Sequence, residues 1–284
     1  MVSNGVKALD QLSLTITNGM FGLLGSNGAG KSTLMRTIAA LQEPTSGTIQ
    51  FNDIDILKKP QLLRAQLGYL PQEFGVYPRI SAYKLLDHLA VLKGILQKQQ
   101  RKEQVEALLQ KTNLYEVRKK SVSSFSGGMR QRFGIAQALL GDPQLIIVDE
   151  PTAGLDPEER NRFHNLLSEI GENRIVLLST HIVEDVRDLC TNMAIMGEGR
   201  LIIKGQPTQL IESLTGKIWQ KTINKQDLTQ YHTAFQVISS RLFAGKTQIH
   251  VLADYQPDSS FKQVDAGLED VYFSSLQNTS TFTH

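Results

Sequence analysis

One glycine-rich stretch constrains the fold of this chain more than any other feature, the run from Met20 to Thr33. A short apolar segment of strand character leads into a turn with Gly25, Gly28 and Gly30, and a helical pattern begins at Lys31. Because glycine lacks a Cβ, the backbone can curl until several N–H groups point inward, beside the positive end of the helix dipole. The sequence therefore predicts a strand, a phosphate-holding loop and a helix in succession.

The residues around this turn supply the charge and the ligand that a nucleotide needs. The ammonium group of Lys31 can lie between the β- and γ-phosphates, and the hydroxyl group of Ser32 can bind Mg²⁺. Because a strand precedes the pattern and a helix follows it, a chance occurrence in an ordinary turn is disfavoured. We therefore predict a site for a nucleoside triphosphate with Mg²⁺. Its predicted residues are Gly25, Ser26, Asn27, Gly28, Ala29, Gly30, Lys31, Ser32 and Thr33.

Composition narrows the class of protein. The chain has 284 residues, 40% hydrophobic and 20% charged, which is typical of a globular protein with one large or two modest domains. A formal net charge of +2 argues against a nucleic-acid partner. Cys190 is the single cysteine, which is typical of a reducing compartment, and we expect it to be a small buried hydrophobe. The sequence has no secretory signal and no apolar run of about 18 residues, so we expect that it does not cross a bilayer by itself.

The first half of the chain reads as short strands followed by a helical stretch. Residues 1–19 predict a strand in which Leu12, Leu14 and Ile16 alternate with polar neighbours. Beyond the phosphate loop and its helix, strands are expected to begin at Thr48 and Leu67. From about 81 to 140 the pattern is helical, with one helix from the cap Ser81 to Gly94 and another near 99–111.

The second half alternates between strands and helices. The predicted strands are 145–149, 174–179 and 192–196, and the predicted helices are 157–170 and 182–190. Such alternation predicts a parallel sheet with crossover helices, and ligands bind at the carboxyl ends of its strands. A hairpin then leads to a strand at 201–203. Beyond Gly216, strands at 217–224, 235–242 and 247–252 and a final helix predict a small α+β region.

Two carboxylates, Asp149 and Glu150, end the apolar strand that begins at Leu145. Alternation along a strand places the two acids on different sides, so they can serve different roles. Asp149 is suited to support Mg²⁺, and Glu150 is suited to orient and deprotonate a water molecule in line with the γ-phosphate. A simple pair of acids at a strand end is the alternative, and the phosphate loop earlier in the chain disfavours it.

A second pair of glycines begins another helix. Ser126 can cap this helix, and helix initiation alone would account for the serine. Gly127 and Gly128 follow it, and two glycines at a helix start reduce stability. A close approach of the backbone to an anion explains them better.

Taken in order, these motifs resemble the nucleotide-binding subunit of an ABC (ATP-binding cassette) transporter. The resemblance covers about residues 7–205 and is carried by 25–32, Gln72, 126–129, 145–150, 153–156 and His181. It implies an α/β fold of the P-loop NTPase type: a RecA-like core with a parallel sheet, an antiparallel β subdomain and an inserted helical subdomain. The helical subdomain would span about 79–141, the ATPase domain 1–214 and an accessory α+β region 215–284. The sequence leaves the role of the accessory region open.

The resemblance also implies that two such chains bind ATP between them. Each ATP would lie between the phosphate loop of one chain and Ser126, Gly127 and Gly128 of the other, so that one chain does not complete its own site. Asp156 resembles the aspartate that faces the other subunit, and it can also cap the helix begun by Pro157. A homodimer and a heterodimer both remain open.

Further roles follow from the resemblance, position by position. Gln72 resembles the glutamine that touches Mg²⁺ and the attacking water, in a loop that continues through Tyr77 and reports to the membrane partner. His181 resembles the switch histidine that reaches the γ-phosphate and holds Glu150 and the water in position. A solvated loop glutamine and a structural histidine are the alternatives for these residues taken alone. The implied catalytic residues are Lys31, Gln72, Glu150 and His181, and the implied Mg²⁺ residues are Ser32, Gln72 and Asp149.

The chain departs from the family pattern at two places. The family usually has an upstream aromatic residue that stacks on adenine, and Met1–Lys7 contains none. Met129 stands where the family often has glutamine. Met129, together with residues 130–132 and 268–273, makes the chain resemble cassettes of the drug, antibiotic or bacteriocin export branch.

We therefore expect an ATPase that converts ATP to ADP and phosphate and drives a separately encoded membrane permease, an exporter of a drug, antibiotic or peptide. The chain would be cytoplasmic and held on the inner face of the cell membrane by the permease, with a second nucleotide-binding subunit and no nucleic acid as partners. A soluble ABC ATPase acting on ribosomes or DNA, and a regulatory ATPase, are the alternatives. The nearly neutral charge disfavours the first, and Glu150 with His181 disfavours the second.

Overall fold

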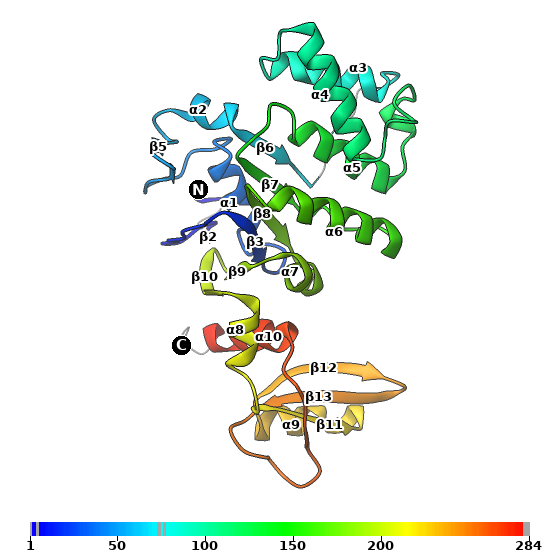
Figure 1. The fold of residues 1–284 in the computed structure, drawn as a ribbon. Coiled ribbons are helices and arrows are strands. Elements are labelled where there is room, and N and C mark those ends of the chain that lie inside the picture. The colour runs from blue at the N-terminus through cyan, green and yellow to red at the C-terminus, as the bar shows by residue number, and fades with distance from the viewer. Residues whose placement is uncertain (1, 4–5, 73–74, 76–77, 281–284) are drawn as a thin grey trace.

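The structure of the protein, a computed structural model, describes residues 2–3, 6–72, 75 and 78–280. Its centre is a six-stranded sheet with the strand order β10-β9-β3-β8-β7-β6 (Figure 1). The strands from β9 to β6 pair in parallel, and β10 pairs antiparallel with β9. The parallel sheet predicted from the sequence is confirmed. Its strands are β3 (Gly19–Leu24), β6 (Leu67–Leu70), β7 (Leu145–Asp149), β8 (Ile175–Thr180), β9 (Asn192–Gly197) and β10 (Arg200–Gly205).

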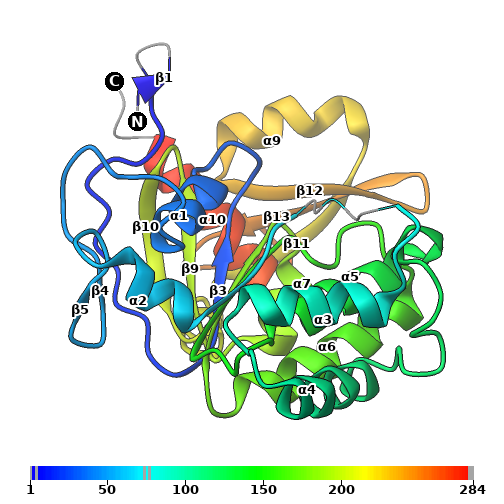
Figure 2. The ribbon, with the colours of Figure 1, turned by 90° about the horizontal axis from the view of Figure 1, so that it is seen from above.

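Apolar side chains cover both faces of this sheet, because successive residues of a strand point to opposite faces. In β7, Ile146 and Val148 join one buried cluster, while Leu145 and Ile147 join another. Helices α1 and α2 pack on the second face, and α3, α5, α6 and α7 pack on the first (Figure 2). The helices are α1 (Lys31–Ile38), α2 (Pro60–Ala65), α3 (Ala82–Leu92), α4 (Lys98–Lys111), α5 (Gly127–Ala138), α6 (Pro157–Gly171) and α7 (Val183–Leu189).

The helical stretch between β6 and β7 forms as predicted. The side chain of Ser81 caps α3 by accepting a hydrogen bond from the backbone N–H of Lys84 at 3.4 Å. The helix ends before Gly94, which has a φ of +87°. Helix α4 buries Val105, Leu108 and Leu109. Within the described ranges, none of the helices has the length and apolar character needed to cross a membrane.

The predicted strand over residues 1–19 is wrong for most of its length. The structure has two-residue strands at β1 (Val2–Ser3) and β2 (Val6–Lys7) and no strand between residues 8 and 18. Four apolar residues of this segment pack instead against the buried cluster that includes α1, namely Leu9, Leu12, Leu14 and Ile16. Their alternation therefore reflects side-chain packing of a segment without regular secondary structure. Another short antiparallel pair follows α1, formed by β4 (Gln50–Phe51) and β5 (Ile54–Asp55).

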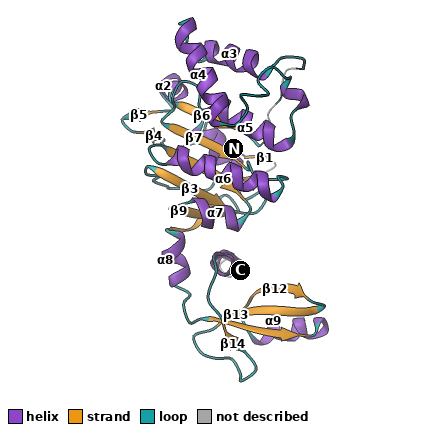
Figure 3. Ribbon diagram, turned by 45° about the vertical axis from the view of Figure 1, so that its right-hand side comes forward, coloured by secondary structure: helices purple, strands orange, loops and turns teal. Residues whose placement is uncertain are grey.

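Beyond β10 the chain builds a second, smaller sheet (Figure 3). The strand order is β12-β13-β11-β14, and the sheet has its own apolar cluster of Ile223, Val237, Ile249, Val251 and Phe261. The predicted strands and final helix form here, while α8 and α9 were not predicted. The elements are α8 (Pro207–Glu212), β11 (Ile218–Ile223), α9 (Leu228–Ala234), β12 (Val237–Phe243), β13 (Lys246–Leu252), β14 (Lys262–Gln263) and α10 (Leu268–Ser280).

The last helix, α10, packs on both sheets. It contacts α7, β9 and β10 of the first part and β12 of the second. Leu268, Val271 and Tyr272 belong to the same buried cluster as α5, α6 and α7. The division of the chain after residue 214 stays a prediction, and α10 returns across that point to lie beside α8, between the larger and the smaller sheet (Figure 1).

Candidate active site

Four segments meet at one edge of the central sheet. Strands β3, β8, β7 and β6 are adjacent and parallel, so their carboxyl ends lie at the same edge. The phosphate loop follows β3, while Gln72, Glu150 and His181 follow β6, β7 and β8. The fold thereby brings together the four residues that the sequence identified as catalytic candidates.

The phosphate loop has a backbone conformation that glycine adopts without strain. Gly28 and Gly30 have φ angles of +84° and +100°. A Cβ on Gly30 would lie 2.6 Å from the carbonyl oxygen of Ala8, so a side chain has no room there. Residues 26–28 are exposed, and α1 begins directly behind them at Lys31. The loop therefore presents its backbone to solvent in front of a helix N-terminus, as an anion site requires.

The buried side chain of Lys31 lies at the base of this loop. Its Nζ donates hydrogen bonds to the carbonyl oxygens of Gly25 at 2.7 Å and Ser26 at 3.1 Å. The same atom lies 3.4 Å from Oε1 of Glu150. The ammonium group is thus fixed where it can reach phosphate oxygens that the loop N–H groups hold.

The carboxylate of Glu150 is the point at which the other candidates converge. Its Oε2 accepts a hydrogen bond from Nε2 of Gln72 at 3.3 Å and lies 3.1 Å from Nδ1 of His181. The backbone of Glu150 has a φ of +48°, which is uncommon for a residue with a side chain, and its N–H donates to the carbonyl oxygen of Ser179 at 2.9 Å. Such conformations cluster at functional sites, where the surrounding structure holds them in place.

Asp149 has the features of a group that helps to hold a cation. Its side chain is buried, and Oδ1 has no hydrogen-bond partner among the described residues. Buried polar atoms are normally hydrogen-bonded, so an unpartnered carboxylate oxygen indicates a further ligand such as a cation or its water. Ser32 and Gln72 add oxygen donors at the same edge of the sheet, and an all-oxygen set is what Mg²⁺ prefers. The residues present therefore fit Mg²⁺.

Two other predicted site segments stand at the N-termini of helices. Ser126 caps α5 by accepting a hydrogen bond from the N–H of Met129 at 3.2 Å, and Gly127 beside it is exposed. Asp156 is also exposed and caps α6, accepting from the N–H of Glu159 at 2.9 Å. Helix α5, which Ser126 caps, and helix α1 pack on opposite faces of the central sheet (Figure 2).

Two further expectations concern single residues. Cys190 is buried, and burial raises the pKa of its thiol, so it behaves as the small hydrophobe that the sequence predicted. Tyr77, in the loop that the resemblance assigned to the membrane partner, lies outside the described residues.

Comparison with known proteins places this geometry in one family. The family model described as ABC transporter matches residues 9–153. The ABC transporter ATP-binding protein NatA of Bacillus subtilis (strain 168) is 38% identical over 211 residues, which are 73% of this chain and 85% of NatA. The chain belongs to the ABC transporter family. It is an ATP-binding subunit of the ABC type that hydrolyses ATP, and such subunits act as dimers with a membrane permease.

Two more comparisons refine this result. Nod factor export ATP-binding protein I of Cupriavidus metallidurans (strain CH34) is 37% identical over 210 residues, 73% of this chain and 69% of that protein. Among solved structures, the dimeric ATP-binding cassette MJ0796 in a post-hydrolysis state with ADP and Pi has a TM-score of 0.62. Its sequence identity is 25%, and the match covers 71% of this chain and 91% of that chain. The predicted cassette fold and ATPase activity are confirmed.

One residue near the site of this ABC ATPase was not identified from the sequence. Asp185, in α7, has a fully buried side chain. In the sequence it stands among the apolar residues Val183, Val186 and Leu189, and a carboxylate on the buried side of a helix is the signal that could have found it. Its hydrogen-bond partners lie in α6, in the segment that follows β7 and at the end of β8.

Proposed function

We propose that this ABC ATPase drives a separately encoded permease that exports a drug, antibiotic or peptide. The relative named for Nod factor export supports the direction of transport, and residues 268–273 resemble the export branch. The chain would lie on the cytoplasmic face of the cell membrane, held there by the permease. Selection of the cargo would belong to the permease, since the described site is built for a nucleotide.

The observation that carries the catalytic proposal is the convergence of three side chains on Glu150. Its carboxylate would accept the proton of a water molecule aligned with the γ-phosphate. His181 and Gln72, at 3.1 and 3.3 Å, hold that carboxylate in place. Lys31 would stabilise the charge on the transferring phosphoryl group, because catalysis of this reaction is mostly positioning and charge stabilisation.

Magnesium would be held by Ser32, Gln72 and Asp149. When bound, Mg²⁺ draws negative charge from the phosphate oxygens. The unpartnered Oδ1 of Asp149 supports this assignment. Asp149 and Glu150 then serve different roles although they are adjacent in the chain.

A second chain would complete the ATP site. Ser126 and Gly127 are exposed at the start of α5, which packs on the face of the sheet opposite α1, and this supports contact with the γ-phosphate bound by a partner. The exposed Asp156 would face the same partner. Closure on ATP and reopening after hydrolysis would then drive the permease.

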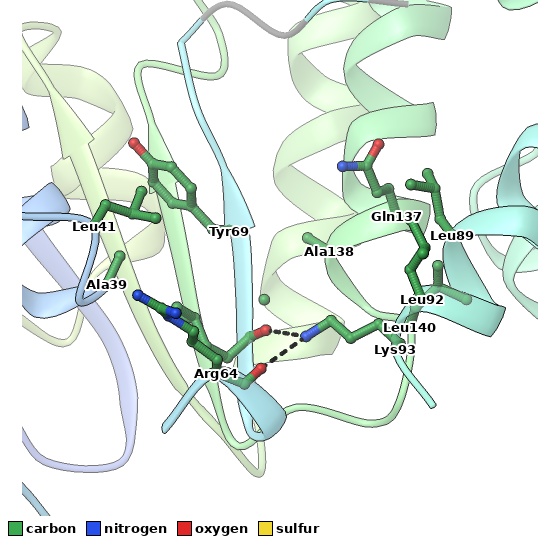
Figure 4. Close-up of a pocket in the computed structure, with 12 residues that line it drawn as sticks. Ala39, Leu41, Arg64, Tyr69, Leu89, Leu92, Lys93, Gln137, Ala138 and Leu140 are labelled. Atoms are coloured by element: carbon green, nitrogen blue, oxygen red, sulfur yellow. Dashed lines mark hydrogen bonds between the residues drawn. The ribbon is translucent and has the colours of Figure 1, made fainter. Parts of the chain in front are cut away.

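We place the permease contact in a groove between the central sheet and the helical stretch (Figure 4). The groove has a volume of about 390 Å³, with Leu41 and Tyr69 on one side and Leu92 on the other. Leu41 and Leu92 are 58% and 70% exposed, and an amphipathic helix of the permease could bury both. Tyr69 is in β6, whose following loop carries Gln72, so a helix docked here would lie beside the segment that reaches the catalytic site.

Replacing Glu150 with glutamine in the full chain tests the catalytic proposal. The amide keeps the size of the side chain but cannot accept the proton of water, so we expect phosphate release to fall by about 100-fold or more. ATP binding should persist, and an ATP-dependent dimer should accumulate in size-exclusion chromatography. Glu158→Gln, an exposed acid on α6, is the matched control with normal turnover. Near-normal hydrolysis by Glu150→Gln would remove Glu150 from the role of base.

A further inference from the structure

Asp185 links the segments that carry two of the candidate catalytic residues, Glu150 and His181. Its side chain is 0% exposed. One carboxylate oxygen, Oδ2, accepts hydrogen bonds from Oγ1 of Thr152 at 2.5 Å and from Oγ1 of Thr180 at 3.2 Å. Thr152 comes two residues after Glu150, and Thr180 directly precedes His181. One buried oxygen atom thus connects the segment that follows Glu150 with the residue that precedes His181.

The hydroxyl group of Thr180 extends this link past His181. While it donates to Asp185, its oxygen accepts a hydrogen bond from the backbone N–H of Ile182 at 3.0 Å. The backbone is therefore held on both sides of the histidine. Directly after β7, Glu150 has its uncommon φ of +48°, a conformation that needs restraint from its surroundings.

The second carboxylate oxygen of Asp185 contacts two residues of α6. Oδ1 accepts a hydrogen bond from Nε of Arg160 at 2.9 Å and lies 2.8 Å from Nε2 of His164. Burial alone would raise the pKa of Asp185, but hydrogen bonds from His164, Thr152 and Arg160 hold that pKa below its usual value. The group is therefore a charged acceptor at neutral pH, and charge-assisted hydrogen bonds are the stronger kind.

We propose that Asp185 is a positioning residue for ATP hydrolysis, which acts through Thr152 and Thr180 to fix the carboxylate of Glu150 against the ring of His181. The inference rests on the proposed function, because it takes the catalytic roles of Glu150 and His181 from there. The carboxylate of Asp185 does not itself contact the reacting atoms; it sets the relative position of two groups that do.

The test removes the two hydroxyl groups, because replacing Asp185 itself would also leave Arg160 without its buried partner. In the full chain, Thr152→Val and Thr180→Val keep the side-chain shape but lose the hydrogen bonds to Asp185. We expect each to lower kcat for Mg²⁺-ATP by about tenfold, since small misplacements of catalytic groups are costly. The KM for ATP should stay within about twofold, because binding by the phosphate loop is unaffected. The matched variants Thr152→Ser and Thr180→Ser keep the hydroxyl groups and should restore kcat.

Measuring Glu150→Gln in parallel separates the inference from the proposed function. If Glu150→Gln is inactive while both valine variants keep kcat within about twofold of the wild type, the inference is overturned and the proposed function stands. If the valine variants raise KM as much as they lower kcat, or the serine variants fail to restore kcat, Asp185 serves stability and the inference is overturned. If Glu150→Gln hydrolyses ATP normally, the proposed role of Glu150 as base and the inference are both overturned.

Discussion

At the scale of single residues, the charge of Asp185 makes the stability of the fold depend on pH. Its folded-state pKa is lowered, so the ionised carboxylate contributes its full stability above the unfolded-state pKa of about 3.9. That contribution is lost as the pH falls through the folded-state pKa. We expect Asp185→Asn to lower the free energy of unfolding at pH 7 by about 3 kcal/mol, because Arg160 loses its buried partner.

Urea unfolding curves of the wild type and Asp185→Asn at a series of pH values check this prediction. The difference between the two should shrink steadily below about pH 4, where the wild-type carboxylate takes up a proton. The control is Asp188→Asn, on the same helix, where an exposed acid pairs with Arg187 at the surface. It should change stability by no more than about 0.5 kcal/mol. A difference for Asp185→Asn that stays constant down to low pH would contradict the assigned charge state.

At the scale of elements, α10 should stabilise the ATPase part of the chain although it comes last in the sequence. Leu268 is 2% exposed within the main buried cluster, whereas Phe273 on the same helix is 38% exposed. We expect Leu268→Ala to reduce the free energy of unfolding by about 3 kcal/mol, as a cavity in a packed core does. Phe273→Ala should reduce the free energy of unfolding by clearly less. Thermal unfolding followed by circular dichroism measures both, and equal losses would show that α10 does not pack as described.

Local signals in the sequence were enough to predict most elements of the core. Helix α3 has a capping serine and an ending glycine, and β7 is a short apolar run with acids at its end. Helices α8 and α9 are short and bury little of their surface, so periodicity could not reveal them. The prediction of a strand over residues 1–19 was wrong because alternating apolar residues indicate which side of a segment is buried. They do not indicate whether a neighbouring strand is present to pair with it.

The candidate site was predictable to the extent that it lies at strand ends. Gln72, Glu150 and His181 each follow a strand, and the order of strands in the sheet brings them together. The role of Asp185 was not predictable in this way. Its partners Thr152 and Thr180 meet it only through the packing of α7 against the sheet, which no local pattern encodes.

At the scale of the whole molecule, Gly127 offers a way to disturb a partner without disturbing the fold. The residue is exposed, and a Cβ added there would meet no atom within 4 Å. Aspartate at the first turn of a helix is compatible with the helix dipole, so Gly127→Asp should fold normally. Its carboxylate would repel a γ-phosphate bound by the other chain. We therefore expect this variant to melt like the wild type and yet to release little phosphate.

The sharing of each ATP by two chains can then be tested by mixing inactive variants. In a mixed dimer of Lys31→Ala and Gly127→Asp chains, one site combines both defects, and the other pairs an intact phosphate loop with an intact glycine pair. An equal mixture should regain up to about a quarter of wild-type phosphate release, since half of randomly formed dimers are mixed and each has one intact site. Lys31→Ala mixed with Glu150→Gln should regain nothing, because Nζ of Lys31 and Oε1 of Glu150 lie 3.4 Å apart in the site of one chain. Recovery in the second mixture, or none in the first when mixed dimers form, would contradict a shared site.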